Sequence, residues 1–312
     1  MDYLTIGKLG PNKGKFDLEA KLMIRNALAE TELVLNPDGS VYHISLREKH
    51  VADNVLLVGD QDRVAQISRH FDNIETRIQN REFITHTGNY KGKRITALST
   101  GIGTDNIDIV VNELNAAVNI DLESKKIKTE SRSLNLIRIG TTGSLQEDIR
   151  PGSSIVSLFG LGFDGLIYYY DYDFTQEEKN LAQKINDHLQ WNPKLSIPYL
   201  IKGSEKLINK IGHDMKRGIT ATATGFYGPQ GRSLGSKLSN EHMNESLQSF
   251  SYQDLRITNF EMETSALYSL GKLFGHNCFT CCLVIANRAR KEYLPDHGAA
   301  MDGLIETVLD RL

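Results

Sequence analysis

The sequence predicts an α/β fold, a three-layer α/β/α sandwich around a central mixed, twisted β-sheet. Short runs of β-branched and aliphatic residues alternate along the chain with longer segments whose apolar residues recur at helical spacing. This alternation is typical of a sheet covered by helices on both faces. No internal repeat, low-complexity tract or long linker divides the chain, so residues 41–312 are expected to form a single domain.

The predicted elements follow in order. Residues 17–30 form an amphipathic pattern that Asp17 can cap, which predicts a helical extension within residues 1–40, and Pro37-Asp38-Gly39 predicts a turn. Apolar residues at helical spacing predict helices at 62–71, 105–118, 176–189, 263–274 and 299–312. Short apolar runs predict strands at 55–58, 94–99, 134–139, 154–158, 219–223, 257–260 and 279–286. The charged stretch 122–133 is expected to be a surface loop or helix extension.

Composition restricts the class of function. The 312 residues are 40% hydrophobic and 24% charged, and the net charge of −3 gives no indication of a nucleic-acid partner. No apolar run approaches the roughly 20 residues of a membrane-spanning helix. Residues 1–14 lack the apolar core of a signal peptide, so we expect a cytoplasmic protein without a membrane partner. Cys278, Cys281 and Cys282 share one apolar run and are predicted to be buried strand residues, not metal ligands or a disulfide framework.

Five short segments follow predicted strands, where open α/β sheets bind ligands. Residues 59–63 (GDQDR) bring a glycine and an arginine to the start of a helix, which suits an anion, although a plain turn with a surface arginine explains them too. In RIGTTG (138–143), Arg138 lies within an apolar strand and must either pair with a carboxylate or bind an anion. STGIG (99–103) lacks the third glycine of a dinucleotide fingerprint, because residue 106 is Asn, so a close-packed turn is predicted.

The other two segments carry groups suited to a base and a sugar. FYGPQGR (226–232) combines aromatic rings with Gln230 and Arg232, which complement the carbonyl groups and the N–H of uracil; the alternative is an ordinary loop. Glu261-Met262-Glu263 sets two carboxylates before a helix. These carboxylates either hold sugar hydroxyls or act as helix N-terminal acids.

Together these segments resemble one family, the uridine phosphorylase branch of the nucleoside phosphorylases. The likeness runs from about residue 41 to residue 288. Its most specific stretches are RIGTTG (138–143), FYGPQGR (226–232) and NFEMET (259–264), and LVIANR (283–288) is similar to the last core strand of the family. The resemblance implies the nucleoside phosphorylase fold. It also implies phosphorolysis of a pyrimidine nucleoside, uridine above all, to free base and α-ribose 1-phosphate in pyrimidine salvage.

The resemblance further implies a role for each matching residue. The phosphate-binding positions match Gly59, Arg63, Arg81, Arg138 and Thr141. The ribose-binding positions match His43, Thr141, Met262 and Glu263. The base-binding positions match Phe226, Gln230, Arg232 and, more weakly, Glu261, with Arg288 as a supporting neighbour. The expected catalytic residues are Arg138, Glu263 and Arg232. Arg81 and His43 match residues that serve the neighbouring subunit's site, which implies a homodimer or a hexamer built from dimers.

Three other functions remain as alternatives. A nucleosidase of the same fold uses water, and the three matching phosphate arginines argue against it. Purine phosphorylases carry an Asp in the loop after the last core strand, where this chain reads Ala286-Asn287-Arg288. A catalytically silent nucleoside-binding protein would not require Glu263 beside the arginines. No cofactor is implied, since phosphate is a co-substrate. Some bacterial members bind potassium at the dimer interface through a Ser, and Asn106 in its place argues against that site, which would also use Glu82.

Overall fold

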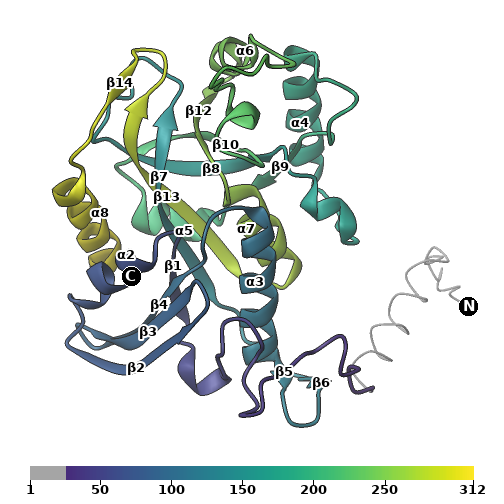
Figure 1. Ribbon diagram of the computed structural model, residues 1–312, viewed down its shortest axis with the longest axis vertical. Coiled ribbons are helices and arrows are strands. Elements are labelled where there is room, and N and C mark those ends of the chain that lie inside the picture. The colour runs from purple at the N-terminus through teal and green to yellow at the C-terminus, as the bar shows by residue number, and fades with distance from the viewer. Residues whose placement is uncertain (1–25) are drawn as a thin grey trace, which may run out of the picture.

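The computed structural model describes residues 26–312 (Figure 1). Its helices are α2 (Gln61–Ser68), α3 (Thr104–Asn119), α4 (Gln176–Leu189), α5 (Glu205–Ile211), α6 (Met243–Ser249), α7 (Thr264–Leu273) and α8 (Gly298–Arg311). Its strands are β1 (Asn54–Val58), β2 (Asn73–Asn80), β3 (Phe83–Tyr90), β4 (Lys93–Ser99), β5 (Ile120–Asp121), β6 (Lys126–Ile127), β7 (Asn135–Ser144), β8 (Ser154–Gly162), β9 (Tyr199–Lys202), β10 (Lys216–Thr222), β11 (Ser251–Tyr252), β12 (Leu255–Glu261), β13 (Asn277–Asn287) and β14 (Glu292–Tyr293). Three 3-10 turns complete the description: η1 (Glu48–His50), η2 (Leu166–Tyr169) and η3 (Gly228–Gln230).

The main sheet is mixed, in the order β11-β12-β10-β8-β13-β7-β1-β4-β3-β2. Strands β4, β1, β7 and β13 run parallel to one another, as do β8, β10 and β12, and the two groups meet antiparallel between β13 and β8. At its carboxyl end β12 also pairs antiparallel with the end of β7, Phe260 opposite Gly143. This second junction brings the ends of the two strand groups together.

Alternating side chains of each strand enter different cores on the two faces of the sheet. Val55 and Leu57 of β1 pack with α3 and α7, whereas Leu56 and Val58 pack with α2, α5 and α8. A third core lies under α4 and α6. Helices therefore cover both faces, and the predicted fold class is confirmed.

Every strand predicted from the sequence is present, as are the helices predicted after residue 60, with shifts of a few residues at their ends. Strands β2, β3, β9, β11 and β14 and helices α5 and α6 were not predicted. Strand β2 (NIETRIQN) lies at the edge of the sheet and leaves every second side chain exposed, so it carries no apolar run. The three cysteines are free and buried, as predicted.

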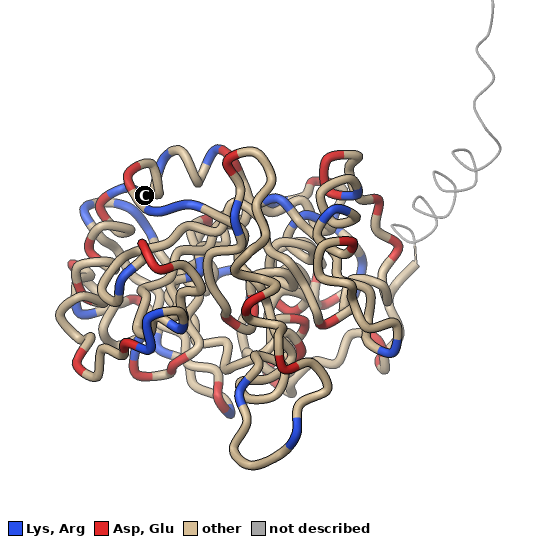
Figure 2. Tube along the Cα trace, turned by 90° about the horizontal axis from the view of Figure 1, so that it is seen from above, with Lys and Arg blue, Asp and Glu red and all other residues tan. Residues whose placement is uncertain are grey.

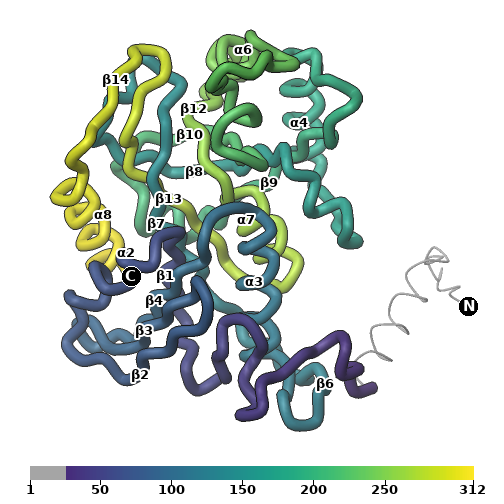
Figure 3. Tube along the Cα trace, viewed as in Figure 1, coloured from purple at the N-terminus to yellow at the C-terminus, as the bar shows by residue number. Residues whose placement is uncertain are grey.

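Two predictions near the N-terminus need correction. Residues 26–30 are not helical, because the amide of Leu28 bonds the carbonyl of Lys125 and a turn follows at Ala29; residues 17–25 lie outside the described part. The stretch 122–133 is not simply a loop, since β5 and β6 form a short hairpin at its start. Figure 3 shows the first described residues beside this hairpin. The predicted turn at Gly39 is present, with φ of 80°.

The charged residues are distributed over the whole trace. Lys and Arg alternate with Asp and Glu in the view from above, and neither sign forms a continuous stripe there (Figure 2). Within residues 26–312, no helix is both long enough and apolar enough to cross a membrane.

Candidate functional site

One cavity of about 760 Å³ opens where several strands end. Its walls come from the turn after β1, the second half of β7, the loop after β10, the end of β12 and the last residues of β13. The junction of β12 with β7 explains how segments distant in sequence share this cavity.

Most of the candidate residues meet here. The cavity is lined by ten of the positions singled out in the sequence: Gly59, Arg63, Arg138, Thr141, Phe226, Gln230, Arg232, Glu261, Met262 and Glu263. His43 and Arg81 do not reach it. Ile102, Ile285 and Tyr293, which were not predicted as site residues, add apolar surface to its wall.

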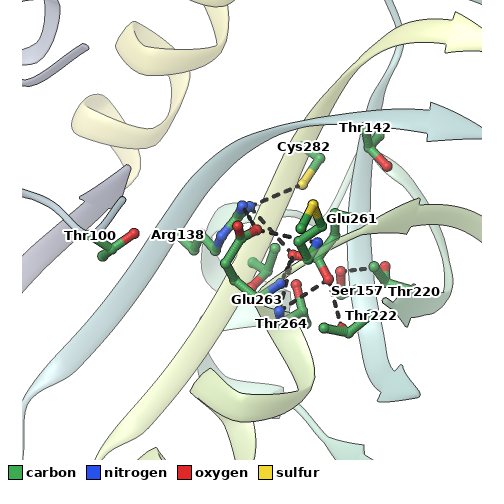
Figure 4. A network of polar contacts seen from close by, with 12 residues as sticks. Thr100, Arg138, Thr142, Ser157, Thr220, Thr222, Glu261, Glu263, Thr264 and Cys282 are labelled. Atoms are coloured by element: carbon green, nitrogen blue, oxygen red, sulfur yellow. Dashed lines mark hydrogen bonds and ion pairs between the residues drawn. The ribbon is translucent and has the colours of Figure 1, made fainter. Parts of the chain in front are cut away.

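Arg138 lies at the floor of the cavity and is almost fully buried. Its Nη2 donates to Glu263, and its Nη1 lies 3.6 Å from a carboxylate oxygen of Glu261 (Figure 4). Burial lowers the pKa of Arg138, but the two carboxylates more than offset this effect and raise it overall. The ion pair that the sequence offered as one alternative is therefore present. Nε of Arg138 is buried and has no hydrogen-bond partner among residues 26–312, while the side chain as a whole lines the cavity.

The two carboxylates of Glu261-Met262-Glu263 bond different partners. Glu261 accepts the backbone amides of Glu263 and Thr264 and, at 2.7 Å, the hydroxyl of Thr222, so its oxygens are engaged at the start of α7. Glu263 accepts the amide of Gly103 at 2.9 Å as well as Arg138. The helix N-terminal alternative holds for Glu261, whereas Glu263 is held beside Arg138, and sugar binding by these carboxylates stays a prediction.

Burial raises the pKa of Glu263; Arg138 opposes this effect and Glu261 reinforces it. The amide of Gly103 favours the charged form, because it begins helix α3, whose N-terminus attracts negative charge. The STGIG segment is thus more than a close-packed turn. The residue that it holds lies 160 positions further along the chain, so no local pattern pointed to this bond.

Arg63 approaches Arg138 from the first turn of α2. Its side chain is 11% exposed, and Asp60, at 4.0 Å, is its ion-pair partner. Burial lowers the pKa of Arg63, Asp60 opposes this effect and the charge of Arg138 adds to it. Two guanidiniums close together at a helix N-terminus form a site that favours an anion.

The opposite end of the cavity is organised around Gln230, which is only 3% exposed. Its Oε1 accepts from Arg232 at 2.8 Å and from Arg288 at 2.5 Å, and Arg288 also bonds its backbone carbonyl. The guanidinium of Arg232 lies 3.9 Å from the ring centre of Phe226. Burial lowers the pKa of Arg288 to about 10, and Arg232 contributes to the shift.

This arrangement changes what Gln230 offers to a ligand. A glutamine amide can supply a ligand with both a donor and an acceptor, and the sequence predicted both here. Two arginines share its oxygen, and its Nε2 donates to no other group among residues 26–312. The amide is therefore oriented with its donor available.

His43 and Arg81 lie together outside this cavity. His43 and Tyr42 line a second cavity, of about 810 Å³, and Arg81 donates to the Tyr42 hydroxyl at 3.3 Å. Nδ1 of His43 lies 2.6 Å from Glu113, which also accepts the amides of His43 and Ile44. Glu113, on α3, is a residue that the sequence analysis missed. Within the described residues, no group of three or more His, Cys, Asp or Glu side chains is arranged to hold a metal ion.

Comparison with known proteins gives consistent matches. The model of the phosphorylase superfamily matches residues 53–307. A uridine phosphorylase of Thermococcus kodakarensis is 32% identical over 82% of this chain and 80% of its own length. A DeoD-type purine nucleoside phosphorylase of Clostridium perfringens is 29% identical over 76% of this chain and 83% of its own length.

Solved structures show the same fold. A Trypanosoma brucei nucleoside phosphorylase, described as having uridine phosphorylase activity, superposes with a TM-score of 0.82 at 29% identity, covering 90% of this chain and 99% of that one. A uridine phosphorylase from Phytophthora capsici superposes with a TM-score of 0.64 at 24% identity, covering 92% of this chain and 98% of that one.

Proposed function

The chain belongs to the phosphorylase superfamily, and we propose that it cleaves the N-glycosidic bond of a pyrimidine nucleoside, uridine above all, with inorganic phosphate. Its matched curated relatives are uridine and purine nucleoside phosphorylases, so its class of enzyme is pentosyltransferase. The observation that carries the proposal is the pairing of two arginine clusters across one cavity. Arg63 and Arg138 line one part of the cavity, and Arg232 and Gln230 line another; Arg288 does not line the cavity but bonds the amide oxygen of Gln230.

Phosphate binds at the first cluster. Arg63 and Arg138 supply charged donors, Thr141 supplies a hydroxyl, and the N-terminus of α2 adds its dipole. The nucleoside lies between the clusters, with Glu263 and Met262 against its ribose. One phosphate oxygen forms a bond to the anomeric carbon as the bond from that carbon to the base nitrogen breaks, giving α-ribose 1-phosphate with inversion. Fixing both reactants in one cavity removes much of the entropic cost of this displacement.

The transition state separates charge between sugar and base. The sugar becomes oxocarbenium-like, and the negative charge of Glu263 stabilises it. The electron pair of the broken bond goes to the base, which leaves as an anion. Gln230 Nε2 and the guanidinium of Arg232 donate where that charge accumulates, so their bonds strengthen in the transition state.

Pyrimidine specificity is supported at the end of β13. Purine phosphorylases use an Asp in this loop, and here Arg288 occupies it and bonds Gln230. Asn287 is committed elsewhere, because its amide donates to the carbonyls of Gln146 and Ile149. The matches to purine phosphorylases make purine nucleosides the second candidate substrate.

His43 and Arg81 complete the site of a second subunit in a homodimer. Both lie outside the cavity of their own chain, and His43 is one-third exposed, with its ring fixed by Glu113. In this arrangement Arg81 adds a third guanidinium to the neighbour's phosphate, and His43 contacts the neighbour's ribose. The dimer is tested by light scattering at assay concentration. A fully active monomer would contradict the shared site.

The reaction is tested with a panel of uridine, deoxyuridine, thymidine, inosine and adenosine, each with and without phosphate, reading free base and sugar phosphate. We expect uracil and ribose 1-phosphate from uridine only when phosphate or arsenate is present. Equal uracil release in phosphate-free buffer would assign the protein to the nucleosidases. Faster turnover of inosine or adenosine would make it a purine phosphorylase, and nucleoside binding without product would make it a silent binding protein.

A further inference from the structure

The guanidinium of Arg138 is confined by a cysteine on the side away from Glu263. The Arg138 side chain extends toward the carboxyl end of β7 and lies over Gly140, whose register partner on β13 is Cys282. Nη1 of Arg138 lies 3.6 Å from Sγ of Cys282 (Figure 4). A Cβ on Gly140 would lie only 1.9 Å from Nη1 and 3.0 Å from this sulfur, so the guanidinium requires the glycine beneath it.

The thiol is a weak acceptor that does not compete for charge. Burial raises the pKa of Cys282 to about 12, against the opposing effect of Arg138, so the group is a neutral thiol at physiological pH. A neutral sulfur accepts a weak hydrogen bond and fills space without neutralising the guanidinium, whereas a third carboxylate would do so. Glu263 holds Nη2, and Nη1 lies between Cys282 and Glu261, each 3.6 Å away, while the buried Nε has no partner within residues 26–312.

We propose that Cys282 is a positioning residue for the anion site: its thiol holds the Arg138 guanidinium in the orientation in which that side chain lines the cavity and binds phosphate. The inference rests on the proposed function, because phosphate is the ligand assigned to Arg138. Cys282 itself does not line the cavity, so it acts through Arg138 and makes no contact with substrate.

Three substitutions separate the contributions of the sulfur. Cys282→Ser keeps a small neutral acceptor, Cys282→Ala removes the acceptor and leaves space, and Cys282→Val fills the space without an acceptor. We expect the KM for phosphate to be about 5- to 20-fold higher in the Ala and Val variants, because each has lost one hydrogen bond to a charged group. We expect the Ser variant to remain within about threefold of the wild type, and the KM for uridine to change less than about twofold in all three.

Cys281 provides the matched control. It is equally buried on the same strand, but it packs in the core on the opposite face of the sheet, with α2, α5 and α8. Cys281→Ala should lower the melting temperature as Cys282→Ala does and leave the KM for phosphate unchanged. As a readout without turnover, inorganic phosphate should raise the melting temperature of Cys281→Ala by as much as that of the wild type, and that of Cys282→Ala by less.

The outcomes distinguish a failure of the proposed function from a failure of the role of Cys282. Wild-type turnover that is independent of phosphate would overturn the proposed function, and the role of Cys282 with it. If wild-type turnover requires phosphate, equal KM values for phosphate in Cys281→Ala and Cys282→Ala would overturn only the positioning role of Cys282. Wild-type phosphate binding by Cys282→Val would also overturn the positioning role, because it would show that the sulfur contributes by packing alone.

Discussion

Replacing Gln230 by Ala tests the base-recognition end of the cavity. The substitution removes the Nε2 donor that remains free for a ligand and the oxygen shared by Arg232 and Arg288. Both arginines then lose their shared side-chain acceptor and keep only backbone carbonyls, that of Phe226 for Arg232 and that of residue 230 for Arg288. The phosphate cluster is built by other segments, around β1, β7 and α7, and should be unaffected.

The size of the loss follows from the charge on the leaving group. A hydrogen bond to a developing anion contributes about 2–4 kcal/mol in the transition state. At about 1.4 kcal/mol per factor of ten, Gln230→Ala should lower kcat/KM for uridine by roughly 30- to 1,000-fold. The fold should survive, because Gln230 belongs to a short 3-10 turn in a loop and not to a packed strand.

Gln230→Glu is the informative control. It keeps the shape of the side chain and gives both arginines a stronger acceptor, but it has no N–H donor and places negative charge beside an anionic leaving group. It should therefore be at least as slow as Gln230→Ala while melting no lower than wild type. The assay is uridine phosphorolysis by both purified variants, beside their melts with and without phosphate. Near wild-type kcat/KM in a well-folded Gln230→Ala would show that this residue does not read the base.

Three more predictions address the remaining parts of the site. Arg63→Met should raise the KM for phosphate roughly 10- to 100-fold. It should not lower the melting temperature in phosphate-free buffer, because it removes a buried charge beside Arg138. A large loss of stability would instead make Arg63 a structural residue. Burial raises the pKa of Glu263, so the carboxylate takes up its proton at a higher pH than an exposed glutamate, and kcat/KM for uridine should fall on the acid side above the ordinary glutamate range. A pH–rate profile still flat at and below that range would exclude Glu263 as the ionised group that binds ribose. Glu113→Gln should lower kcat/KM roughly 3- to 10-fold for uridine but not for 5′-deoxyuridine, since Glu113 acts through His43 on the 5′ hydroxyl; equal losses with both substrates would contradict that route.

The sequence was sufficient where a local pattern carried the information. Alternating apolar runs predicted the α/β class, and polar residues placed directly after strands predicted which segments would meet. Arg138 stood out because an arginine in an apolar strand requires a partner or an anion, and the structure contains its ion pair with Glu263. Strand β2 escaped prediction because an edge strand with one exposed face has no such pattern.

Contacts between elements far apart in the chain could not be predicted from the sequence. The amide of Gly103 holds Glu263, Glu113 holds the ring of His43, and Arg288 occupies the oxygen of Gln230. In each pair the two groups belong to segments far apart in the chain, and nothing in either segment identifies the other as its partner. The antiparallel pairing of the ends of β12 and β7 brings two of the cavity walls together, and no local pattern in either strand predicts it.

The two ends of the cavity differ in how their positive charge is balanced, and this difference suits the direction of the reaction. Arg138 is already paired with carboxylates, so phosphate approaches a site whose net charge is moderate. Arg232 and Arg288 bond only neutral oxygens, those of Gln230 and the carbonyl of Phe226, and neither has a carboxylate within ion-pair distance among residues 26–312. Their charge is uncompensated in the free protein. It is therefore available to the base, which becomes an anion only as the glycosidic bond breaks.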